Sequence, residues 1–122
     1  MSAIFGSIKD LPLEQVTELY SRRSLVGEKE MISWATMKAG MHAAAHSHHH
    51  EQIFWILSGV MEFRIGEEKR LCRAGDIVLV PPNADHEAWC PEDTEFVTIL
   101  APPREDLLLG AELPDHLKQK QE

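Results

Sequence analysis

Five of the seven histidines of this chain fall between His42 and His50, directly ahead of its most apolar segment. Imidazole is the commonest protein ligand for divalent transition metals, and a dense histidine tract is typical of either a metal site or a purification tag. Tags lie at chain ends, whereas this tract lies mid-chain and leads into the apolar run Gln52 to Leu57. The tract therefore predicts a metal site.

His46 and His48 are expected to share one face of a strand, because side chains alternate along β structure. Gln52 keeps the same parity if no bulge intervenes. Two imidazoles hold a metal only weakly, so further ligands must come from elsewhere in the chain. The candidate is His86, which follows a strand-like run that ends at Pro81.

A formal net charge of -8, from 12 Lys and Arg against 20 Asp and Glu, opposes binding to nucleic acid and to anionic membranes. With 122 residues, the chain is expected to form a single domain over 1–122. Its longest apolar stretches are far shorter than the roughly 20 residues that span a bilayer. We therefore expect neither nucleic acid nor membrane as a partner.

Two cysteines, Cys72 and Cys90, are too few for a disulfide framework. The opening residues MSAIFGSIKD lack the basic start and the long apolar run of a signal peptide. Both features predict a cytoplasmic protein. Cys90 lies four residues beyond His86, but an unactivated strand cysteine is typically a small core residue, so we assign it no catalytic role.

From Met31 onward, short β-type runs alternate with Gly, Pro, Asn or charged turns, at the spacing of an all-β sandwich or barrel. The segments Leu57 to Val60 and Ile65 to Glu68 are predicted to be hairpin turns, each with a glycine. The predicted strands are Met31 to Lys38, Glu51 to Leu57, Val60 to Gly66, Asp76 to Val80, Glu87 to Trp89 and Glu95 to Leu100.

The two ends of the chain are predicted to differ from this barrel. A short N-terminal helix is predicted from four apolar residues at helical spacing, with Asp10 and Pro12 as start signals. Beyond Pro102, the sequence mixes the apolar Leu107 to Leu109 with a charged end, which predicts an irregular C-terminal segment. The four helix-defining residues are Leu13, Val16, Leu19 and Tyr20.

The spacing around the first histidines is similar to the first motif of the cupins. That motif has Gly, five residues, His-x-His, three or four residues, Glu, six residues and Gly. Gly40, His46, His48, Gln52 and Gly59 fit it, with Gln in place of Glu. A match with correct internal spacing is far more specific than a lone His-x-His.

The second cupin motif has Gly, five residues, Pro-x-Gly, two residues, His, three residues and Asn. Gly75, Pro81 and His86 match it, while Asn83 and Cys90 replace its later Gly and Asn. Agreement at both motifs means that the chain resembles a small single-domain cupin. This resemblance implies an all-β fold, a jelly-roll-like antiparallel β-barrel with its core over about residues 20–104.

The resemblance also implies that His46, His48, Gln52 and His86 hold one divalent metal ion per chain. Because Gln52 supplies a neutral amide instead of a carboxylate, the metal would keep its full positive charge. Such a site suits Lewis-acid chemistry, in which an oxygen ligand is polarised or the pKa of bound water is lowered. This favours zinc or nickel, with iron or manganese as the alternatives.

Within the cupins, His46-x-His48-x-His50-Glu-Gln52 followed by Ala101-Pro-Pro-Arg104 resembles the KdgF-type enzymes of pectin and alginate breakdown. Those enzymes help to open unsaturated uronate sugars to their linear keto form. The resemblance implies that Arg104 is a catalytic residue that pairs with a substrate carboxylate, against the alternative of a surface arginine.

One departure from these enzymes concerns proton transfer. They carry Asp-x-Phe where this chain has Thr98-Ile99-Leu100, and a threonine cannot act as an acid or base at neutral pH. If proton transfer is required, the remaining candidates are Glu87, His42, His49 and His50.

We therefore predict lyase, isomerase or cyclase chemistry on a small polar or cyclic carbonyl compound such as a sugar acid. A metal-dependent dioxygenase and a non-catalytic small-molecule sensor are the alternatives. Because Glu51 to Leu57 is apolar on both faces, its outer face needs cover, and we also expect a homodimer. An aromatic-lined interior is expected from Trp34, Trp55, Trp89, Phe54, Phe63 and Phe96.

Overall fold

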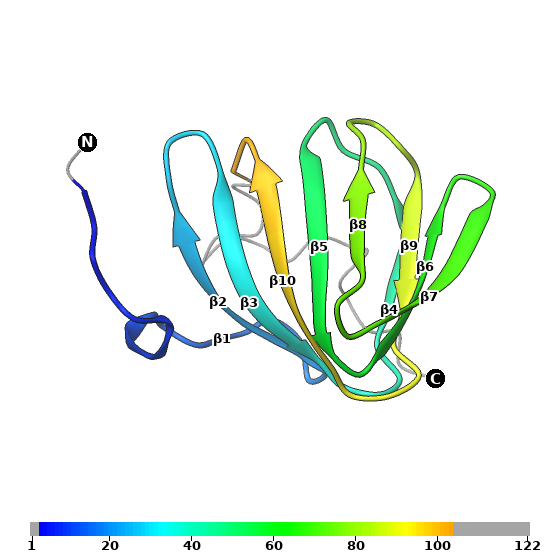
Figure 1. Ribbon diagram of the computed structural model, residues 1–122, viewed down its shortest axis with the longest axis horizontal. Helices are drawn as coiled ribbons and strands as arrows, with labels where there is room; N and C mark the ends of the chain where they lie inside the picture. Colours follow the sequence, from blue (N-terminus) through cyan, green and yellow to red (C-terminus); the bar gives the residue numbers. More distant parts are fainter. Residues whose placement is uncertain (1–2, 104–122) are drawn as a thin grey trace.

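The computed structural model describes residues 3–103 and confirms the predicted all-β class. Two antiparallel sheets face each other across one core (Figure 1). The six-stranded sheet has, in spatial order, β1 (Glu14–Gln15), β2 (Tyr20–Val26), β3 (Met31–Met37), β10 (Thr94–Ala101), β5 (Glu51–Ser58) and β8 (Ile77–Val80). The four-stranded sheet has β4 (His42–His46), β9 (His86–Trp89), β6 (Val60–Ile65) and β7 (Glu68–Arg73).

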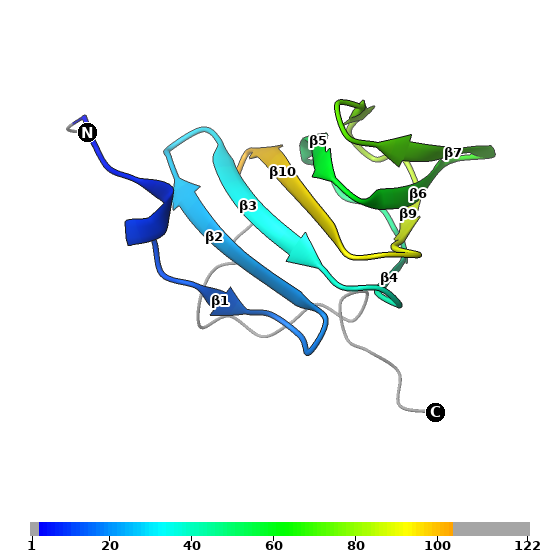
Figure 2. The same cartoon turned by 60° about the horizontal axis from the view of Figure 1, so that its bottom comes forward.

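The core forms because alternate side chains of each strand point between the sheets. In β3 every second residue from Met31 to Met37 is buried, and in β5 the buried positions are Gln52, Phe54 and Ile56. Turning the molecule brings the space between the two layers into view (Figure 2). The same alternation that fills the core therefore decides which side chains reach the interior.

All six predicted strands are present, with ends that shift by one residue or so. Among residues 3–103, four further strands were not predicted: β1, β2, β4 and β7. The segment Glu68–Arg73 is mostly charged, and its single buried side chain is Cys72, so it carries little apolar alternation. Its pairing with β6 is a tertiary outcome and not a local preference.

The predicted N-terminal helix over Leu13 to Tyr20 is wrong. That segment contains β1, a tight turn and the start of β2, while a single 3-10 turn, η1 (Ile8–Asp10), precedes it. Val16 and Tyr20 pack against the core, which explains why they are apolar. The amide of Val16 donates to the carbonyl of Tyr20, so the helical spacing reflects a chain reversal.

The predicted hairpin at Leu57 to Val60 is also wrong, because β5 and β6 belong to different sheets. Gly59 has a φ of 85° and makes a corner between the layers. A Cβ there would lie 2.2 Å from the backbone oxygen of Asp93, which no side chain tolerates. The connection between β6 and β7 is a hairpin, as predicted.

Among the described residues, no helix is long and apolar enough to cross a bilayer.

Candidate metal centre

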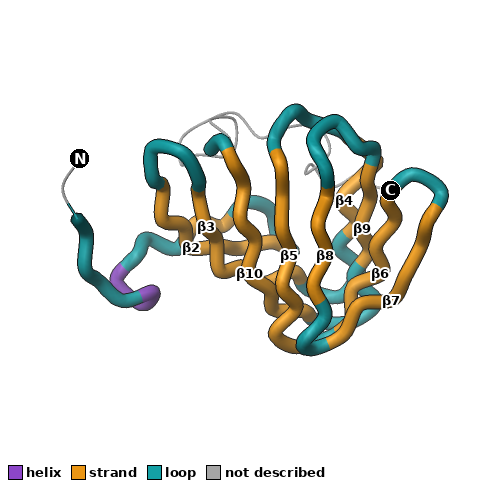
Figure 3. The backbone as a smooth tube through the Cα atoms, turned by 45° about the horizontal axis from the view of Figure 1, so that its top comes forward, coloured by secondary structure: helices purple, strands orange, loops and turns teal. Residues whose placement is uncertain are grey.

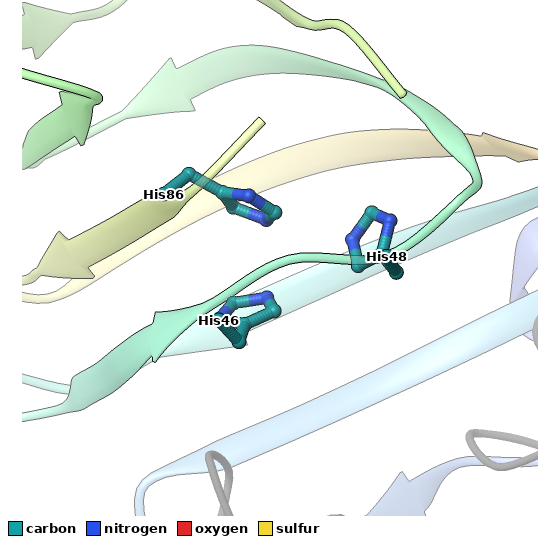
Figure 4. A group of neighbouring side chains, drawn as sticks. All are labelled: His46, His48 and His86. Atoms are coloured by element: carbon teal, nitrogen blue, oxygen red, sulfur yellow. The ribbon is translucent and has the colours of Figure 1, made fainter. Parts of the chain in front are cut away.

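Three histidines gather at one end of the space between the sheets. His46 ends β4, His86 begins β9, and His48 lies in the connection between β4 and β5. Their rings turn toward one another (Figure 4), and one ligand nitrogen from each lies within 4.8 Å of the others. The ring centroids of His46 and His86 are 4.1 Å apart, and those of His48 and His86 are 4.9 Å apart. The structure thus brings together the three histidines that the sequence singled out.

Backbone carbonyls fix how these three rings present their nitrogens. The Nδ1 atoms of His46, His48 and His86 lie 2.7, 3.1 and 2.9 Å from the carbonyl oxygens of Ala44, His50 and Ala84. Because a carbonyl can only accept, each Nδ1 must carry the proton. A neutral ring then keeps its lone pair on Nε2, which is the atom that a metal requires.

Gln52 lies beside this group on the inner face of β5 and is buried. Its Nε2 donates to the hydroxyl oxygen of Thr98 at 3.0 Å, and its Oε1 lies 3.2 Å from Nε2 of His48. With the His48 proton on Nδ1, two acceptor atoms face each other across that gap. A cation between them would turn this contact from unfavourable to favourable, so the donor set fits a divalent metal.

Local backbone structure holds the two motifs together. Asn83 has a φ of 67°, a left-handed conformation that asparagine tolerates better than other non-glycine residues, and it stands where the cupin motif has Gly. The backbone N–H of Asn83 donates to the backbone carbonyl of His48 at 2.7 Å. The loop that carries His48 and the turn after β8 therefore lie side by side at one end of the barrel (Figure 3).

Apolar side chains line the barrel below this group. The ring of Phe63 is parallel to that of His86, with centroids 6.2 Å apart, and Phe54 packs edge-on against Phe63. Phe96 completes this aromatic cluster and is almost fully buried. The expectation of an aromatic interior holds for these phenylalanines. It is wrong for the three tryptophans. Trp34 and Trp55 lie on the outer face of the six-stranded sheet, where Trp55 is 51% exposed, and Trp89 lies on the outer face of the four-stranded sheet, stacked on His42.

Two candidates for proton transfer point away from the histidine group. Glu87 and His42 are on the outer face of the four-stranded sheet, where Nε2 of His42 donates to Oε2 of Glu87 at 2.5 Å. Burial alone would raise the pKa of the Glu87 carboxyl, but hydrogen bonds from His42 and Arg64 lower it below its ordinary value. Glu87 is thus a partner in a surface ion-pair network.

The other predicted residues divide into those near the group and those that the structure does not describe. The ring of His50 lies 5.2 Å from that of His48 and 4.0 Å from that of His49. Arg104 lies outside the described residues, as does the predicted irregular C-terminal segment.

Burial raises the pKa of the Cys90 thiol to about 11, which agrees with a core role.

Sequence reasoning missed the hydrogen bond between Thr98 and Gln52. Thr98 is polar, yet it shares the inward parity of Phe96 and Leu100 on a predicted strand. A polar residue among inward apolar positions was the available signal, because a buried hydroxyl needs a partner.

Two stacked antiparallel sheets, with polar side chains from both converging between them, define a small double-sheet β-barrel protein. Residues 33–101 match the cupin domain family, and the chain belongs to that family.

Solved structures of cupins share the fold. An RmlC-like cupin from Shewanella frigidimarina NCIMB 400 is 25% identical, with a TM-score of 0.81 over 88% of this chain and 97% of that one. KdgF from Halomonas sp. is 23% identical, with a TM-score of 0.80 over 88% and 100%. Ectoine synthase from P. lautus is 16% identical, with a TM-score of 0.71 over 84% and 80%. Among curated proteins, none matches the sequence.

Proposed function

We propose that this cupin holds one divalent metal ion on His46, His48, His86 and Gln52 and acts on a small polar or cyclic carbonyl compound, such as a sugar acid. The reaction class is a lyase, isomerase or cyclase step. The observation that carries the proposal is the convergence of the three histidines, whose Nδ1 atoms face backbone carbonyls and whose ligand nitrogens lie within 4.8 Å of one another.

The donor set indicates which chemistry the ion would supply. Three neutral imidazoles and one amide would leave the charge of a bound divalent ion uncompensated, so the residues would hold an ion that supplies Lewis-acid chemistry to a substrate oxygen. Zinc and nickel suit this donor set, with iron or manganese as alternatives. The protein's part is to hold the donors in place and to keep the surroundings dry, which the buried Phe63 and Phe96 favour.

The structural likeness to KdgF from Halomonas sp. supports an acidic sugar as the compound, and Arg104 would pair with its carboxylate. The hydroxyl of Thr98 binds the Gln52 amide and cannot serve as an acid or base at neutral pH. A substrate whose reaction needs no acid or base at position 98 therefore fits this chain better than the uronate linearisation of the KdgF type.

The test combines metal analysis with turnover assays. We expect about one zinc or nickel ion per purified chain, and His86→Ala to lose most of it. His42→Ala is the matched control, because it removes a histidine of β4 that points away from the group. Wild-type protein is then assayed with unsaturated uronates and other cyclic carbonyl acids.

Three results would count against the proposal. Equal metal content in the wild type and in His86→Ala would mean that the metal does not bind at the histidine group. Oxygen consumption that depends on added Fe²⁺ would replace the Lewis-acid reaction with dioxygenase chemistry. A compound that binds tightly and is recovered unaltered would favour a sensor.

A further inference from the structure

A row of hydroxyl groups crosses the inner face of the six-stranded sheet. Strand register places Ser24 of β2 beside Ser33 of β3, and Ser33 beside Thr98 of β10. On the next strand, β5, Phe54 stands opposite Thr98, and Gln52 lies on the same face two residues earlier in the chain. The hydroxyls of Ser24 and Ser33 are 2.7 Å apart. The hydroxyl of Thr98 contacts the Gln52 side chain, so it links this row to the histidine group.

The contact between Thr98 and Gln52 is buried. Thr98 is 5% exposed and Gln52 is 8% exposed. Because water has little access there, the two ends of the Gln52 amide depend on partners within the site. Its Nε2 donates to the hydroxyl oxygen of Thr98 at 3.0 Å. Oε1 is therefore the end of the amide that lies toward His48, 3.2 Å from Nε2 of that ring.

The Gln52 amide has a competing orientation. Rotation by half a turn would place its Nε2 beside the lone pair on Nε2 of His48. That arrangement is a good hydrogen bond and a poor metal site, because an amide nitrogen that bears two hydrogens has no electron pair for an ion. The observed orientation therefore needs a group that accepts the amide hydrogen on the other side, and Thr98 supplies it.

We infer that Thr98 is a positioning residue, which accepts the amide hydrogen of Gln52 and so keeps the Gln52 oxygen toward the histidine group. The inference rests on the proposed metal function. The amide N–H becomes a stronger donor when Oε1 binds a cation, because the oxygen then draws electron density from the nitrogen. Loss of the Thr98 hydroxyl therefore weakens the metal-bound form more than the metal-free form.

Metal affinity and the geometry around the bound ion test this role separately. The full chain is stripped of metal with a chelator and titrated with Zn²⁺ in a calorimeter, and the absorption spectrum of its Co²⁺ form is recorded. Thr98→Val keeps the branched shape and removes the hydroxyl, so we expect the Kd for Zn²⁺ to rise about 10- to 100-fold and the Co²⁺ bands to change. Thr98→Ser returns the hydroxyl and should restore both.

A double-mutant cycle tests whether Thr98 acts through Gln52. Gln52→Ala removes the amide that the hydroxyl positions, so this substitution should weaken Zn²⁺ binding by itself. Adding Thr98→Val to that variant should then change the Kd less than about twofold, because no amide is left to orient. A further loss as large as that of Thr98→Val alone would overturn the inference, since Thr98 would then act by another route.

Two control variants separate positioning from general damage to the fold. Ser33→Ala removes a buried hydroxyl of the same inner face, whose contact is with Ser24. Thr36→Val makes the same chemical change as Thr98→Val on the outer side of β3. Both should bind Zn²⁺ like the wild type, and far-UV circular dichroism checks that every variant is folded. A loss of affinity in either control as large as that of Thr98→Val would overturn the positioning role.

The outcomes separate this inference from the metal function itself. Zn²⁺ binding by Thr98→Val with wild-type affinity and spectrum would overturn the positioning role and leave the metal function standing. A wild type that binds no Zn²⁺, Ni²⁺ or Co²⁺ would overturn both.

Discussion

The two faces of β5 are built from the same kinds of residue but serve different ends. Inward, Gln52 reaches the histidine group while Phe54 and Ile56 fill the core. Outward, Ile53, Trp55 and Leu57 are exposed in the part of the chain that the structure describes. The inner and outer apolar residues of this strand should therefore respond differently to substitution.

The largest expected difference compares two isoleucines of this strand. Ile56 is 0% exposed and Ile53 is 38% exposed. Ile56→Ala should cost about 3 kcal/mol of unfolding free energy, because it leaves a cavity, while Ile53→Ala should cost about 1 kcal/mol or less. Urea unfolding of the wild type and of the two variants measures both losses. Equal losses would mean that the outer face is packed within the single chain.

A smaller difference is expected between two serines on opposite faces of the same sheet. Ser33 is buried and its hydroxyl is 2.7 Å from that of Ser24, whereas Ser21 lies on the outer side of β2. Ser33→Ala should cost about 1 to 2 kcal/mol, since it leaves the Ser24 hydroxyl without this partner. Ser21→Ala should be nearly neutral. Thermal unfolding of the two variants would decide, and a larger loss for Ser21→Ala would contradict the assignment of faces.

The smallest effect belongs to the ionic face of the four-stranded sheet. Glu87→Gln should cost about 1 kcal/mol or less, because partly exposed ion pairs contribute little. The pKa of Glu87 is lowered on folding, so its contribution is present above the ordinary glutamate pKa and is lost as the pH falls through the folded value.

Urea unfolding of the wild type and of Glu87→Gln should therefore differ at pH 7 and converge in acid. Metal content should be unchanged, because Glu87 points away from the histidine group. A difference between the two proteins that grows toward acid pH would reverse the predicted sign.

Much of the candidate metal centre could be predicted from spacing. His46 and His48 are two residues apart, and the Gly75 to His86 interval matches the second motif, so the three histidines of the group could be chosen from the sequence. The tautomer of each ring could not be predicted from spacing. It depends on the contacts of the Nδ1 atoms with the carbonyl oxygens of Ala44, His50 and Ala84, which the folded backbone conformation creates.

The errors in the fold have physical causes as well. Leu13 and Tyr20 fit a helical period, yet the segment folds back on itself and Tyr20 joins the core of the sheet. Gly59 was interpreted as a hairpin because glycine permits many turns, and only the close approach of Asp93 makes it a corner. The local sequence permits a helix or a chain reversal at the first segment, and a hairpin or a corner at Gly59. Long-range packing selects the chain reversal and the corner.

The sequence by itself determined the strand alternation, the acidic balance and the donor types of the site, because these depend on residue identity and on periods of two. Tertiary structure alone decided three other matters. It paired Thr98 with Gln52 across β10 and β5, it turned Glu87 and His42 away from the site, and it aligned the outer residues of five strands into rows. Each of these depends on strand register, which is a relation between segments far apart in the chain and leaves no local pattern.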